Sequence, residues 1–106
     1  MSENNLVSNA FQVFASEAPQ HAAAWKGLVQ NLAAANALDQ KTSALAYLSV
    51  LAVLGLESGI PFHVNSAKQA GAMREEVISA VLLGLPAAGH AVTKVLPAAV
   101  NAFDKE

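Results

Sequence analysis

Apolar residues recur along this chain every three or four positions, which is the period of an α-helix, and they almost nowhere alternate with polar residues as in a strand. The first segment has them at Leu6, Ala10, Val13 and Phe14. The second, about residues 20–35, has them at Trp25, Leu28, Val29 and Leu32. Pro19 separates the segments because the residue before a proline disfavours helical conformation. We expect an N-terminal hairpin of two helices over residues 1–35.

The next segment, from Gln40 to about Glu57, is apolar nearly all round. Asp39 precedes it, and an aspartate side chain at this position can accept hydrogen bonds from the free amides of the first turn. A helix with apolar residues on every side is buried on every side. We therefore predict a central helix that lies either in the middle of the domain or against another subunit.

Proline and glycine divide the rest of the chain. Pro61 suits the first turn of a short helix, since its missing N–H would have no partner there, and Gly71 suits the end of that helix. A further helix is expected from about Arg74, and a last one over residues 90–103 with a kink at Pro97. The prediction is one all-α domain of about six helices over residues 1–106, with core helices in 38–104.

Composition adds an expectation of self-association. The chain is 54% hydrophobic and only 13% charged, below the quarter or so that is usual for globular domains. A small domain of this kind has more apolar surface than one core can hide, which predicts a homo-oligomer. The net charge of −2, with single scattered charges, offers no basic stripe for a phosphate backbone, so we expect no nucleic-acid partner.

The two longest apolar runs are residues 44–56 and 77–92. Both are shorter than the roughly 20 residues that cross a bilayer. The first residues, MSENN, lack the basic start and apolar core of a secretory signal. No membrane partner and a cytoplasmic location are expected.

The most specific pattern lies between Gly55 and Glu76, GLESGIPFHVNSAKQAGAMREE. It resembles the motif of the carboxymuconolactone decarboxylase and alkylhydroperoxidase D-like family, whose redox members read G-C-x-x-C-x-x-x-H followed by Gly-Ala and a helix with an acidic start. The positions that match are Gly55, His63, Ala67, Gly71, Ala72, Glu75 and Glu76. Upstream, LDQKTSALAYLS is similar to the family's entry to its central helix, with matches at Leu38, Lys41 and Leu45.

The resemblance implies the family's helical fold and an assembly of trimers or hexamers. It also implies where the redox chemistry would lie. The two cysteine positions fall on Leu56 and Gly59, and Ala44 stands where redox members carry a glutamate. The chain contains no cysteine at all, and thiol-disulfide exchange needs a thiolate. We therefore expect the family's peroxidase chemistry to be lost, with these three positions as its vestiges.

The family's other branch, which decarboxylates carboxymuconolactone, also lacks the cysteines and keeps a histidine at this place. Such a reaction needs a proton donor and a cationic clamp for carboxylates. His63 could be the donor and Lys41 the clamp. Arg74 is the chain's one arginine, so the site is poorer in cations than that branch requires.

The candidate site residues centre on His63. Glu57 and Ser58 lie one turn away and could share its proton as a relay, although a charge at a helix end and a turn hydroxyl explain them better. Lys41 and Phe62 are candidate ligand contacts. A metal site built from Glu57, His63 and His90 is conceivable, but these residues have no ligand spacing, so we expect no metal and no cofactor.

Three hypotheses for function remain open. The leading one is a cysteine-free family member that binds a small ligand beside His63 or serves as a scaffold oligomer. The second is a lyase of the decarboxylase type, and the third is a purely structural homo-oligomer. A closed apolar cavity of about 300 Å³ or more that reaches His63 would favour the first two, and side chains filling that space would favour the third.

Overall fold

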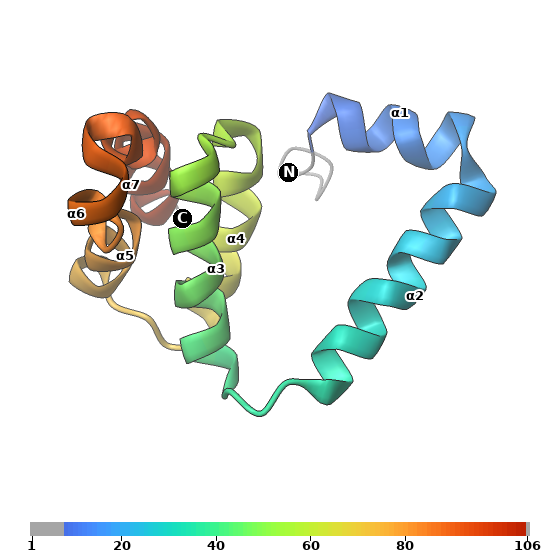
Figure 1. The fold of residues 1–106 in the computed structure, drawn as a ribbon, viewed down its shortest axis with the longest axis horizontal. Helices are drawn as coiled ribbons and strands as arrows, with labels where there is room; N and C mark the ends of the chain where they lie inside the picture. Colours follow the sequence, from blue (N-terminus) through green and yellow to red (C-terminus); the bar gives the residue numbers. More distant parts are fainter. Residues whose placement is uncertain (1–7, 106) are drawn as a thin grey trace. The chain divides into compact units, whose positions relative to one another are not determined.

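The computed structural model describes residues 8–105, so the predicted position Leu6 and the leading MSENN lie outside the described part. Every regular element in the described part is an α-helix or a 3-10 helix (Figure 1), which confirms the all-α fold class. The chain divides into two compact units, Met1–Leu38 and Asp39–Glu106.

The N-terminal unit consists of α1 (Asn9–Glu17) and α2 (Pro19–Ala35). Ser8 begins α1, and its hydroxyl accepts a hydrogen bond from the Phe11 amide at 3.2 Å, as a helix-capping serine does. The two helices meet through aromatic rings, since the Phe11 and Trp25 ring centroids lie 5.2 Å apart. Neither helix buries a residue.

The C-terminal unit begins with α3 (Gln40–Leu54). Asp39 caps it as predicted: its carboxylate accepts from the Thr42 amide at 2.7 Å, and this bond lowers the pKa of Asp39. The helix ends at Gly55, whose φ of 69° is in the left-handed region that glycine adopts without strain. The 3-10 turn η2 (Glu57–Gly59) and α4 (Ile60–Gln69) follow, with Pro61 in the first turn of α4.

The end of the chain differs from the prediction. In place of two helices it forms α5 (Arg74–Leu82), the single turn α6 (Leu85–Ala88), the 3-10 segment η3 (Gly89–Val95) and α7 (Leu96–Asp104). The predicted kink at Pro97 is wrong, because Pro97 lies in the first turn of α7, where a missing N–H costs nothing. The last helix therefore begins at Leu96 rather than near residue 90.

The core of the C-terminal unit lies between α3, α4, α5, η3 and α7. It is made of small and branched aliphatic side chains, with no buried polar residue in the described part: Leu48, Leu51, Ala52, Ile60, Val64, Ala67, Ala72, Val77, Ala80, Val81, Val92, Val95 and Ala99. Only three of these come from α3. Within the C-terminal unit α3 is not buried on every side, since Tyr47, Val50 and Leu54 are about half exposed or more. The alternative location, against another subunit, stays a prediction.

The segment Arg74–Asp104 is long and apolar enough to cross a membrane by length and composition. In the structure it is not one straight helix but four short elements that turn at Gly84 and Gly89. Its Val77, Val81 and Val92 are buried in the core of the C-terminal unit, while 22% of its most apolar stretch is buried in all.

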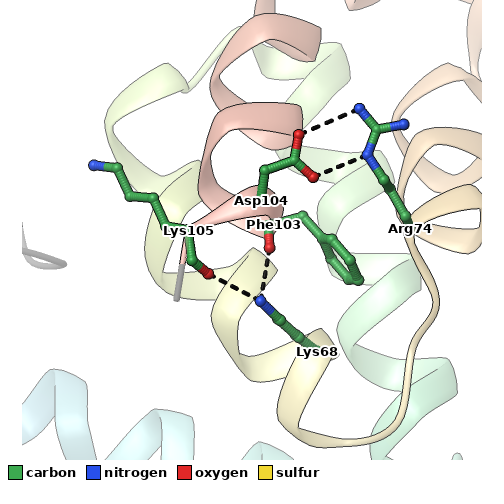
Figure 2. Close-up of polar contacts among 5 residues, drawn as sticks. All are labelled: Lys68, Arg74, Phe103, Asp104 and Lys105. Carbon is green, nitrogen blue, oxygen red and sulfur yellow. Dashed lines mark hydrogen bonds and ion pairs between the residues drawn. The ribbon is translucent and has the colours of Figure 1, made fainter.

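Polar contacts fix the end of α7 to the rest of the C-terminal unit (Figure 2). The Lys68 ammonium donates to the backbone carbonyls of Phe103 and Lys105 at 2.7 and 2.9 Å, where the negative end of the helix dipole favours a cation. The Arg74 guanidinium pairs with the Asp104 carboxylate at 2.9 Å, and this hydrogen bond raises the pKa of Arg74.

Candidate functional site

His63 lies in the first turn of α4, which packs against α3. Its ring centroid is 4.6 Å from that of Tyr47 on α3 and 5.1 Å from that of Phe62. Burial between these rings lowers the pKa of His63 below its ordinary 6.5, because a partly desolvated imidazole disfavours the proton. The burial therefore favours the neutral form of the imidazole.

Glu57 does not face His63 through any hydrogen bond or ion pair in the described part of the chain. Its carboxylate lies 3.7 Å from the Lys94 ammonium, and both side chains are more than half exposed. An ion pair this open contributes little to stability. Ser58 is exposed on the same 3-10 turn. The proton relay of Glu57, Ser58 and His63 remains a prediction, and sequence reasoning missed Lys94 as the partner of Glu57.

Lys41 is engaged elsewhere. Its ammonium lies 2.9 Å from the carboxylate of Glu76, at the start of α5. Glu76 also accepts a hydrogen bond from the backbone amide of Met73 at 2.8 Å. This bond satisfies the N–H of the residue that immediately precedes α5. The bond from Lys41, followed by that from Met73, lowers the pKa of Glu76. The structure thus brings Lys41 to the acidic start of α5.

The hollow beside Lys41 is an open groove between α3 and α5 of about 660 Å³. It is lined by both polar and apolar residues: Lys41, Thr42, Leu45, Ala46, Ser49, Glu75, Glu76, Ser79, Ala80 and Leu83. The Ser49 hydroxyl donates to the Ala80 carbonyl at 2.7 Å and so ties the two helices together. Neither His63 nor Phe62 lines this groove, so it is not the closed cavity at His63 that would favour a ligand there.

The two positions that the resemblance assigns to cysteines, Leu56 and Gly59, lie on the turn that leads into α4. Leu56 is 47% exposed just before η2, and Gly59 immediately precedes α4. A Cβ at Gly59 would meet only Leu51 methyl groups at 3.8 Å, an ordinary contact. The backbone there therefore tolerates a larger residue. Ala44 packs against the core from α3.

Residues 8–105 contain no group of three His, Asp or Glu side chains that could hold a metal ion. The structure thus does not assemble Glu57, His63 and His90 into one site. The imidazole of His63 has aromatic neighbours instead of carboxylates.

Fold and site together define a class: a small all-helical protein in which the turn after the central helix leads to a histidine and carries no thiol. The model of the carboxymuconolactone decarboxylase family matches residues 19–102, and the chain belongs to this family. No curated protein and no solved structure matches it significantly. The match begins at the first residue of α2 and ends within α7, so it includes helices of both units.

Proposed function

We propose that this protein is a cysteine-free, self-associating member of the carboxymuconolactone decarboxylase family that serves as a scaffold and has no thiol peroxidase activity. The observation that carries the proposal is the apolar face of α3. Tyr47, Val50 and Leu54 are 48%, 51% and 63% exposed. Exposed apolar side chains grouped on one face of a small domain are typical of a subunit interface.

The surroundings of His63 favour a scaffold over a catalyst. Aromatic rings occupy the space beside the imidazole, and the chain has no cysteine to act as a nucleophile. General acid-base help accelerates a reaction that some other group must perform. The cation that a carboxylate substrate needs, Lys41, pairs with Glu76. These features support neither peroxide reduction nor decarboxylation at His63.

Sedimentation over a range of concentrations tests the scaffold. We expect the wild type to sediment well above the 10.9 kDa of one chain, and Val50→Asp to shift the equilibrium toward monomer because the charge would have to be buried. Val50→Leu is the matched control and should assemble like the wild type. A wild type that stays monomeric at high micromolar concentration would overturn the proposal.

Turnover assays test the absence of catalysis. Cofactor-free protein is expected to reduce no hydroperoxide with a dithiol donor, and to consume no carboxymuconolactone above the rate without protein. Lactone turnover that disappears in His63→Ala would establish the lyase in place of the scaffold. Peroxide turnover by metal-free protein would contradict the loss of peroxidase chemistry.

A further inference from the structure

The 3-10 segment η3 is unusually long, since it runs for seven residues from Gly89 to Val95. Stretches of 3-10 helix beyond three or four residues are uncommon, because their hydrogen bonds have poorer geometry than those of an α-helix. The apolar residues of η3 also fit α-helical spacing. A specific feature of the chain therefore disfavours an α-helix that would run through η3 into α7.

Pro97 provides a local reason. In an α-helix over residues 90–104, the carbonyl of Thr93 would accept a hydrogen bond from the amide of residue 97, four positions later. Proline has no N–H, and its ring clashes with the carbonyl four positions before it. In the 3-10 form the Thr93 carbonyl accepts from the Leu96 amide instead. The 3-10 form thus supplies the donor that Pro97 removes.

The chain contains an internal comparison for this effect. The tetrapeptide Leu-Pro-Ala-Ala occurs at residues 85–88 and again at residues 96–99. Both copies begin a new helix, α6 and α7, with the proline in the first turn. α6 ends at Gly89, whose φ is 70°, whereas α7 has Val100 at the corresponding position and continues. The same start in two surroundings indicates that the tetrapeptide itself sets the beginning of a helix.

The 3-10 form also suits the core of the C-terminal unit. Val92 and Val95 are fully buried, and the two residues between them are exposed. Three residues complete a full turn of a 3-10 helix, so the two valines lie one above the other. Three residues of an α-helix complete about 300°, which would turn the valines about 60° apart. The α-helical form would therefore move one valine away from its place in the core.

We propose that Pro97 is a conformational lock on η3. It blocks the α-helical form of residues 90–95 and so holds the form in which both valines fill the core. The same form brings the Lys94 ammonium within 3.7 Å of the carboxylate of Glu57, on the turn η2 that leads into α4 and to His63. The lock goes beyond the proposed scaffold and does not depend on it, because all of these residues lie in the C-terminal unit.

Pro97→Ala tests the lock, because it restores an N–H that the wild type lacks. We expect α7 to begin at His90 in this variant, with the new amide bonded to the Thr93 carbonyl. In nuclear Overhauser spectra the Hα of Thr93 should then lie close to the amide hydrogen of residue 97, a contact typical of an α-helix. Far-ultraviolet circular dichroism should show a gain of α-helical signal for residues 90–95.

Pro86→Ala is the matched control, because it changes the other copy of the tetrapeptide and leaves Pro97 in place. This variant should keep η3 in the 3-10 form. Pro97→Ser restores the same N–H with a different side chain, so it repeats the test should the alanine variant fail to fold.

The outcomes decide for or against the lock. An α-helical segment in the Pro97 variants together with a 3-10 segment in Pro86→Ala supports it. A 3-10 segment that persists without Pro97 overturns it and assigns the conformation to the packing of Val92 and Val95 alone. An α-helical segment in all three variants also overturns it, as does a failure of both Pro97 variants to fold, because the lock selects one of two folded forms. None of these results changes the scaffold proposal, which the sedimentation of the wild type tests.

Discussion

The two units show that helices of similar length can have opposite outcomes in burial. α2 has 17 residues and α3 has 15, but α3 contributes Leu48, Leu51 and Ala52 to a core and α2 contributes nothing. The difference lies in the number of packing partners. α3 meets α4, α5 and η3, and a side chain becomes inaccessible only when elements surround it on several sides. Two helices side by side leave most of each surface open.

The core of the C-terminal unit is where this comparison predicts the largest effect. Leu48→Ala removes a fully buried side chain, so we expect the free energy of unfolding to fall by about 2–5 kcal/mol. The control is Leu32→Ala in α2, where the leucine is 61% exposed. It should change stability by no more than about 0.5 kcal/mol at concentrations where the chain is monomeric. Urea denaturation measures both, and equal losses would remove the contrast between the units.

Substitutions at two glycines test the comparison through stability changes of intermediate size. A Cβ at Gly84 would lie 2.9 Å from a Val53 methyl group, so Gly84→Ala should cost about 1–3 kcal/mol through overpacking. A Cβ at Gly27, inside α2, would meet nothing within 4 Å, and Gly27→Ala should stabilise the helix by about 0.5–1 kcal/mol. Thermal melts monitored by circular dichroism should show shifts of opposite sign.

The double variant Gly84→Ala with Val53→Ala provides the control, because it removes the methyl group that the new Cβ meets. It should recover part of the loss. If Gly84→Ala were neutral by itself, the side chain of Val53 would have room to turn away, and the packing at this point would be looser than the distance indicates.

The sequence predicted the parts of the fold that depend on local chemistry. The Asp39 cap and Pro61 in the first turn of α4 follow from side chains and backbone that act within one turn. The end of α3 was predicted at about Glu57, whereas the helix ends at Leu54 with Gly55 as its cap. The family motif was equally readable, because its residues lie within one continuous stretch. The 3-10 segment η3 was missed because its apolar residues also fit α-helical spacing.

Pairings between distant charges could not be predicted in the same way. Lys41 forms an ion pair with Glu76, and Glu57 with Lys94, each across 35 or more positions of sequence. Sequence spacing carries no information on which acid lies opposite which base once helices pack. The bond from Met73 to Glu76 was predictable, since a glutamate three residues after the residue that begins a helix commonly accepts a hydrogen bond from the backbone amide of that residue.

The smallest effect we predict concerns the pH dependence of stability at His63. Burial lowers its pKa in the folded state, so the unfolded chain binds a proton first as the pH falls through about 6.5. The free energy of unfolding should therefore decline from that pH down to the folded-state pKa and then level off. His63→Gln should remove this decline, while His90→Gln should leave the contribution of His63 in place. Denaturant titrations between pH 5 and pH 8 measure it.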